Sequence, residues 1–280
     1  SRGLGDVYKR QAQGFHFDNA TMKPIINNEG WKKAFELYKA TGQYGPPDEL
    51  NMDIGDTRAL FKAGRCGLIV EWGDPGTLQL DDDAKSIRGK MYAISAVGST
   101  EVLDRATGKL VPVSAATAPY AVDGINYAPF AAFGGWAGAV NKGADAKTKA
   151  AAYAFLSYMN QAAQSGVDVT IGATGYNPYR TSQLASTDLW VKAGMPKALA
   201  DNYLGAINGA INNLNMASDM KIPGAQKYTS VVLDTELARY LAGEITVDEA
   251  LANIEEGWEE VTEDFGRDEQ VASQALALGL

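Results

Sequence analysis

Cysteine and histidine are almost missing from this sequence, which has one of each among its 280 residues. Cys66 cannot close an internal disulfide, and one cysteine with one histidine cannot supply the ligands of a structural zinc site. A serine or cysteine catalytic triad would need His16 as its base, but this residue lies between two phenylalanines and is interpreted as a structural or surface residue. Nucleotide-binding glycine loops and the motifs of hydrolases and zinc proteases are absent too. We therefore expect no metal ion and no cofactor.

Basic residues are in deficit. The 25 lysines and arginines are outnumbered by 34 aspartates and glutamates, which gives a formal net charge of −9. An acidic surface repels the phosphate backbone of nucleic acids and the anionic face of a membrane, so we expect neither as a partner. No stretch approaches the ~18 apolar residues of a membrane span. What remains is an ordinary globular composition, 46% hydrophobic, in a chain long enough for two lobes.

The first eleven residues differ in character from the rest. They read SRGLGDVYKRQ, with no initial methionine and no apolar stretch, and a transposase-type sequencing adapter translated in one frame resembles this string. We predict that residues 1–11 are a translated artefact, that the natural chain starts further upstream, and that any targeting signal lies there. The alternative is a genuine loop.

Spacing of apolar residues and turn formers indicates the order of elements. Helices are predicted over 28–41, 56–63, 146–163, 196–213, 224–242 and 246–263, with Asn28, Asp56, Asp145 and Thr246 as caps. Strands are predicted over 66–72, 91–97 and 133–140, and a hairpin is predicted to join 102–103 to 110–111. This pattern is typical of an α/β protein.

Two carboxylates, Glu71 and Asp74, lie where the strand over 66–72 is predicted to end, and α/β proteins place ligand sites at such ends. The pair would suit the acid and the nucleophile of a glycosidase, and a glycoside-acting enzyme is therefore one alternative. No second motif for acid–base chemistry accompanies the pair, so we expect a protein that is not an enzyme.

Aromatic residues recur beside turn-forming residues. A flat apolar ring at the mouth of a loop suits stacking on the C–H face of a sugar, while nearby carboxylates and amides hydrogen-bond its hydroxyls. Filling a core is the other role open to each ring. The residues concerned are Trp72 before Gly73, Trp136 after Gly135, Tyr127 before Pro129, and Tyr176 in the segment GYNPYR, which also holds Asn177 and Arg180.

Four stretches carry a family resemblance through their order and spacing. They are FKAGRCGLIVEW at 61–72, FGGWAGAVNK at 133–142, GYNPYR at 175–180, and YLAG at 240–243 followed by TVDEAL at 246–251. Together they resemble the extracellular solute-binding proteins of ATP-driven (ABC) importers, in family 1, the branch that includes maltose-binding protein.

This resemblance implies a periplasmic-binding-protein-like fold of type II, in which two α/β lobes joined by hinge strands close around a ligand. It assigns residues 12–128 and 200–280 to the C-terminal lobe. Residues 129–199 become the returning part of an N-terminal lobe that is incomplete in this fragment.

The resemblance also implies a function and a set of binding residues. The protein would bind a sugar or oligosaccharide and deliver it to the transmembrane subunits of a permease, as a monomer at full length. Its location would be periplasmic or extracellular, with a lipid anchor left open. A non-sugar solute such as glycerol phosphate or a polyamine is an alternative ligand. Trp72 and Trp136, with Gly135, would stack from opposite lobes; Glu71, Asp74 and Asn177 would hydrogen-bond; Arg180 would serve the ligand or a hinge carboxylate; Tyr228 would add another aromatic ring.

Overall fold

The fold comes from a computed structural model, which describes residues 15–132 and 135–279. Residues 1–11, the predicted artefact, lie outside the described residues, as do Phe133 and Gly134 of the second family-like stretch. About half of the chain is helical and the strands are few, a mixed composition that is compatible with the expected α/β class.

The chain divides into two compact units, each with a core of its own. Within the described residues, unit 1 consists of 15–51, 98–132 and 213–279, and unit 2 consists of 52–97 and 135–212. The expected lobes divide the sequence differently, because they place 52–97 with 12–51, whereas in the structure this stretch packs with 135–212. The assignment of lobes therefore stays a prediction.

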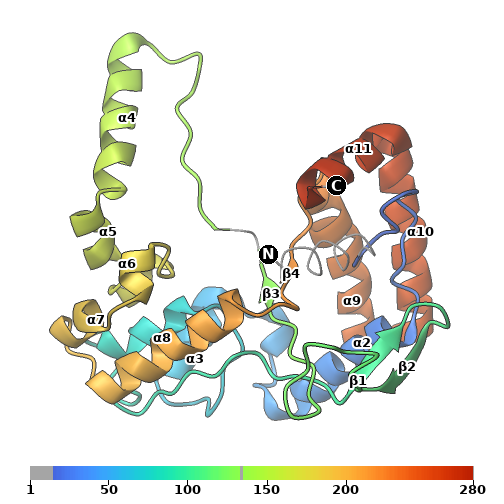
Figure 1. Ribbon diagram of the computed structural model, residues 1–280, viewed down its shortest axis with the longest axis horizontal. Coiled ribbons are helices and arrows are strands. Elements are labelled where there is room, and N and C mark those ends of the chain that lie inside the picture. The colour runs from blue at the N-terminus through green and yellow to red at the C-terminus, as the bar shows by residue number, and fades with distance from the viewer. Residues whose placement is uncertain (1–14, 133–134, 280) are drawn as a thin grey trace. The chain divides into compact units, whose positions relative to one another are not determined.

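Helix α10 (Val247–Phe265) is central to unit 1. It begins at Thr246, whose hydroxyl accepts from the Glu249 amide at 3.2 Å while the Glu249 carboxylate accepts from the Thr246 amide at 2.8 Å, so the predicted capping box is confirmed. Figure 1 shows α10 beside α9 (Asp234–Leu241) and α11 (Arg267–Leu278), and α2 (Glu29–Thr41) packs against it too. The buried face of α10, spaced at helical intervals, is Ala250, Leu251, Ile254, Trp258 and Val261.

Trp258 is fully buried among other aromatic rings in this core. Its indole Nε1 donates to the Tyr228 carbonyl oxygen at 2.7 Å, and the Phe17 ring lies 5.1 Å away between centroids. The Tyr228 hydroxyl shares a hydrogen bond with Thr262 at 2.9 Å, and no part of the Tyr228 side chain is exposed. Tyr228 therefore fills the core of unit 1 here, and does not offer a ring face to a ligand.

The remaining elements of unit 1 are short. The helix predicted over 224–242 consists of a π-helix, η5 (Lys227–Leu233), followed directly by α9. The predicted hairpin is confirmed: β1 and β2 pair antiparallel, with Leu103 opposite Leu110. The strands and short 3-10 helices are β1 (Glu101–Asp104), β2 (Lys109–Pro112), the parallel pair β3 (Phe130–Ala131) and β4 (Ala217–Ser218), η1 (Gly42–Tyr44) and η2 (Glu49–Asn51).

The helix caps follow the sequence at most positions. The Asn28 side chain accepts from the first amides of α2, and Asp145 accepts from the Thr148 amide at 3.0 Å to cap α4, so both predictions are confirmed. The cap predicted at Asp56 is wrong, because α3 (Ile54–Lys62) begins one turn earlier at Asp53 and Asp56 completes a capping box with it. The two aspartates have the same capping chemistry, and the sequence pattern alone does not rank them.

Unit 2 is built mainly from helices. In its core Trp190 and Tyr203, both almost wholly buried, meet edge to face with ring centroids 5.9 Å apart. Tyr203 also covers Gly76, where an added Cβ would lie 2.2 Å from the ring, so only glycine fits. The helices of this unit, besides α3, are η3 (Asp74–Leu80), α4 (Ala146–Met159), α5 (Ala162–Asp168), η4 (Gly172–Thr174), α6 (Thr181–Leu184), α7 (Asp188–Lys192) and α8 (Lys197–Ile211). No helix in either described range is long and apolar enough to cross a membrane.

The strands predicted in unit 2 do not form. Within the described ranges, no strand is assigned to residues 66–72, 91–97 or 135–140. Leu68 and Val70 are 71% and 89% exposed, while Ile69 between them packs against a small core cluster. The prediction of a buried strand is therefore wrong here. An apolar run indicates a strand covered on both faces, but the pairing and the covering layers come from other segments.

His16 makes the stability of unit 1 sensitive to acid. Its ring lies among aromatic rings, 5.8 Å from that of Trp258 between centroids, and burial lowers the pKa of His16 to about 4 against a smaller opposing effect of the Asp219 charge. Because the folded pKa is below that of an unfolded histidine, stability is lost as the pH falls below about 6.5 towards 4.

We expect the free energy of unfolding to be about 2 kcal/mol lower at pH 5 than at pH 7.5 through this residue. Urea denaturation at both pH values would measure it, with His16→Gln as the control that lacks the titrating ring. Equal acid sensitivity in the two proteins would show that His16 does not carry the effect.

Candidate functional site

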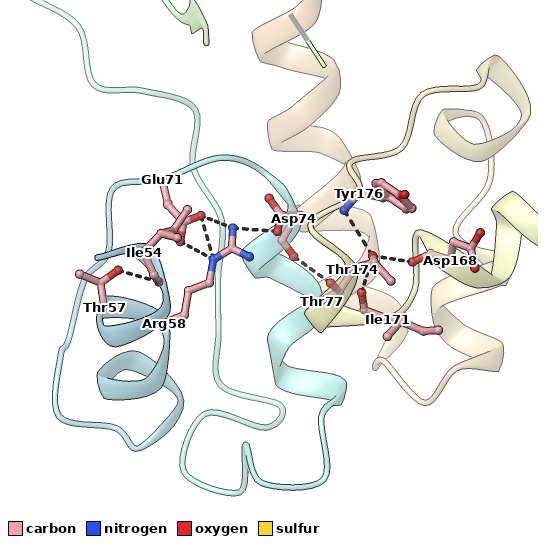
Figure 2. Close-up of polar contacts among 10 residues, drawn as sticks. All are labelled: Ile54, Thr57, Arg58, Glu71, Asp74, Thr77, Asp168, Ile171, Thr174 and Tyr176. Carbon is pink, nitrogen blue, oxygen red and sulfur yellow. Dashed lines mark hydrogen bonds and ion pairs between the residues drawn. The ribbon is translucent and has the colours of Figure 1, made fainter. Parts of the chain in front are cut away.

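One guanidinium joins the two carboxylates that the sequence singles out. Arg58, on α3, donates from Nε to both oxygens of Glu71 at 3.0 and 2.9 Å, and its Nη2 contacts Glu71 Oε1 and lies 2.8 Å from Asp74 Oδ2. Figure 2 shows the guanidinium facing both carboxylates. Glu71 comes from the extended segment before η3, and Asp74 is the first residue of η3. The predicted pair therefore forms, together with Arg58, a three-residue ionic cluster within unit 2.

Burial differs sharply within this cluster. The side chain of Asp74 is 1% exposed, whereas those of Arg58 and Glu71 are 15% and 12% exposed. Burial raises the pKa of Asp74, and the guanidinium of Arg58 opposes that rise. The pKa of Arg58 is itself raised, chiefly by its hydrogen bonds to Glu71. A ligand can therefore reach Glu71 more readily than Asp74. The buried carboxylate of Asp74 forms an ion pair with Arg58.

The loop over 172–177 packs against the start of η3. An added Cβ on Gly73 would lie 2.7 Å from the Asn177 amide oxygen, and one on Gly172 would lie 2.9 Å from the Leu78 Cα, so backbone and side chains approach closely at both glycines. Gly175 has a positive φ of 69°, which suits glycine. Asn177, exposed, is thus brought next to Gly73, within the segment that carries Glu71 and Asp74.

Thr174 organises this loop from within. Its hydroxyl lies 2.9 Å from the Asp168 carbonyl oxygen and 2.8 Å from that of Ile171, and it accepts from the Tyr176 amide at 3.3 Å (Figure 2). The Tyr176 ring packs partly buried against the core cluster that contains Trp190. Tyr176 therefore supports the loop that carries Asn177, and its ring is only partly available to a ligand.

The two tryptophans predicted to stack on a ligand both belong to unit 2, whereas the resemblance placed them on opposite lobes. Trp72 is half-buried and lies between Glu71 and Gly73 in the chain. Trp136 is 77% exposed, which removes it from any core role within this unit. It follows Gly135, whose φ of 96° is one that side chains rarely adopt.

Other predicted residues lie elsewhere. The Arg180 Nε donates to the Ser165 hydroxyl at 3.1 Å, and its Nη2 donates to the Asn160 carbonyl oxygen, so it ties α5 and α4 to the following loop. Tyr127 lies in unit 1, where its carbonyl oxygen accepts from Asn215 at 3.2 Å, and Tyr228 lies in the core of the same unit. The structure therefore brings together Glu71, Asp74, Trp72, Asn177 and Tyr176, and leaves Arg180, Tyr127 and Tyr228 in separate networks.

Arg58 is the residue that the sequence reasoning missed. Two carboxylates three positions apart, one of them in an apolar segment, are a signal that a cation is needed nearby. The sequence does not indicate which of several basic residues provides it. Among the described residues, no group of three or more histidine, cysteine, aspartate or glutamate side chains is placed to hold a metal ion.

Comparison with known proteins identifies no relative. A scan against protein-family models finds none that matches the chain. A search of curated proteins finds no match either.

Proposed function

We propose that this chain is the substrate-binding component of an ABC importer and that it binds a sugar or oligosaccharide for delivery to the permease subunits. The observation that carries the proposal is the gathering, in one unit, of an indole, two carboxylates and an amide. Trp72 directly follows Glu71 in the chain. The Asn177 side chain lies against Gly73, the residue that follows Trp72. Stacking on an indole and hydrogen bonding to carboxylate and amide oxygens are the two interactions that sugars require.

The exposure of Trp136 supports the same proposal. A large aromatic ring left 77% exposed does not stabilise the unit that carries it, and exposed apolar surface of this kind marks binding sites. The finer architecture belongs to the proposal as well: two type II lobes closing around the ligand by hinge motion, in a periplasmic or extracellular protein.

A glycoside-acting enzyme is a second candidate, favoured by one observation. Burial raises the pKa of Asp74 while Glu71, three residues earlier, is held by arginine, and glycosidases use carboxyl groups in such different states. Turnover of a chromogenic glycoside, lost in Glu71→Gln, would favour this candidate. Binding without turnover would favour the receptor.

Calorimetry tests the proposed ligand class. The protein is titrated with glucose, maltose and maltotriose, and in parallel with glycerol 3-phosphate and spermidine. Binding of one or more of the sugars supports the sugar proposal. Binding of glycerol 3-phosphate or spermidine alone would keep a receptor and replace the sugar, and absence of binding to any of the five would contradict the proposal for these solutes.

Trp72→Ala is expected to lower the affinity for the bound sugar by roughly tenfold or more, because it removes the stacking face. The free energy of unfolding should fall by less than the ~3–5 kcal/mol that loss of a core tryptophan costs. Calorimetry gives the first quantity and chemical denaturation the second. Tyr44→Ala, which removes an 85% exposed ring in unit 1, is the matched control. A full core-sized loss of stability with unchanged affinity would make Trp72 a packing residue.

A further inference from the structure

The ionic cluster has more carboxylate than its one cation can neutralise. Arg58 donates to both oxygens of Glu71 and ion-pairs with Asp74 Oδ2 at 2.8 Å. The other oxygen of Asp74, Oδ1, is buried and has no hydrogen-bond partner among the described residues. Two carboxylates and one guanidinium have a net charge of −1 when all are ionised. In the chain, Trp72 lies between the two residues that carry these carboxylates.

Without a cation, the two acids would not both be ionised. Like charges side by side, one of them almost wholly buried, drive one carboxyl group to take up a proton. A protonated acid gives up part of its capacity to accept hydrogen bonds. Arginine remains charged at all relevant pH values, and its planar fork matches the two oxygens of a carboxylate. It therefore fixes the orientation of Glu71.

Glu71 retains the capacity to accept from a ligand. Each carboxylate has about four lone-pair positions, and the contacts with Arg58 use only part of them. Its side chain is 12% exposed, in contrast with the almost wholly buried Asp74. The outward part of this carboxylate is therefore the acceptor that a hydroxyl group can reach.

We propose that Arg58 is a positioning and specificity-determining residue: it fixes Glu71 as a hydrogen-bond acceptor at the position before Trp72, so that the site takes neutral hydroxyl-rich ligands and rejects anionic ones. This inference rests on the proposed function. The Nε and Nη2 groups of Arg58 contact the two carboxylates, whose combined charge exceeds that of the guanidinium. A ligand carboxylate would meet the net negative charge of the cluster.

The experiment combines a ligand-free measurement with a binding measurement. Carboxyl carbon NMR follows the ionisation of Asp74 between pH 3 and pH 8, and calorimetry at pH 7 uses maltose and its anionic oxidation product maltobionate. The variants are Arg58→Gln, which removes the charge, and Arg58→Lys, which keeps the charge without the fork. Lys62→Gln is the matched control, because Lys62 lies one turn further along α3 and pairs with Asp83 at 2.8 Å, away from Glu71.

In Arg58→Gln we expect the titration midpoint of Asp74 to rise, because the guanidinium that opposes the effect of burial is lost, and maltose affinity to fall by about tenfold or more. Arg58→Lys should stay closer to the wild type in titration midpoint than in maltose affinity. Lys62→Gln should match the wild type in both quantities. Wild-type protein should prefer maltose to maltobionate. Wild-type titration midpoints and maltose affinity in Arg58→Gln would overturn the proposal, as would equal or tighter binding of maltobionate by the wild type.

Two further outcomes are separated by design. If Arg58→Gln does not fold, the double variant Arg58→Gln/Asp74→Asn removes the buried charge as well, and its maltose affinity is compared with that of Asp74→Asn alone. If the wild type binds neither maltose nor maltobionate, the sugar proposal fails for these ligands, while the titration still decides whether Arg58 opposes the rise that burial causes in the pKa of Asp74.

Discussion

Trp258→Ala is expected to lower the free energy of unfolding by about 3–5 kcal/mol, the range for removing a buried tryptophan. The side chain is 0% exposed, and the rings of Phe17, Trp31 and Tyr228 all lie within about 6.4 Å of its centroid. The substitution also removes the donor to the Tyr228 carbonyl oxygen, which leaves a buried acceptor unpaired and adds to the loss. Guanidinium denaturation followed by circular dichroism measures this loss of stability.

Trp136→Ala is the matched control for this prediction, because it makes the same change at an indole that is 77% exposed. We expect its effect on stability to stay within about 0.5 kcal/mol, as at other surface positions. Equal losses in the two variants would mean that Trp136 is covered in solution, and a small loss in Trp258→Ala would contradict the assigned core.

Arg58→Ala is expected to lower the free energy of unfolding by about 3–5 kcal/mol, since it leaves buried negative charge without its counterion. Asp74 is the reason for the size of the effect, because its side chain is 1% exposed and cannot be rehydrated without opening the unit. Lys62→Ala, on the same helix, breaks a pair whose aspartate partner is 69% exposed, and should change stability by no more than about 1 kcal/mol.

The loss in Arg58→Ala should depend on pH with a definite sign. Burial already raises the pKa of Asp74, and removal of the guanidinium takes away the interaction that opposes this rise. A carboxyl group whose folded pKa is above its unfolded pKa destabilises the fold when ionised, and this cost disappears as the pH falls through the folded value.

The difference in stability between Arg58→Ala and the wild type should therefore shrink as the pH is lowered from 7 towards 5. Taking the difference at each pH cancels the separate effect of His16, which both proteins share. A deficit that stays constant over this range would show that lost packing of the arginine stem, and not the charge on Asp74, is its cause.

Elements whose signals lie within a few residues could be predicted well. The Asn28 cap with the apolar stripe of α2, the Thr246–Glu249 capping box, and the turn between β1 and β2 each contain the hydrogen bonds that define them. The strand predicted over 66–72 failed for the opposite reason. Its continuous apolar run is present, but the partner strands and covering layers must come from distant segments, and Leu68 is left exposed.

The caps of α2, α4 and α10, and the presence of Glu71, Trp72 and Asp74 within four consecutive positions, follow from the sequence alone, because they involve only chain neighbours. Only the tertiary structure decided that Arg58, 13 residues before Glu71, is their counterion, and that Trp136 is exposed while Tyr228 is buried. Burial and long-range ion pairing depend on which distant segments pack together. A tryptophan or tyrosine in a core can have the same chain neighbours as one at a binding surface. Its burial is therefore set by the distant segments that pack against it.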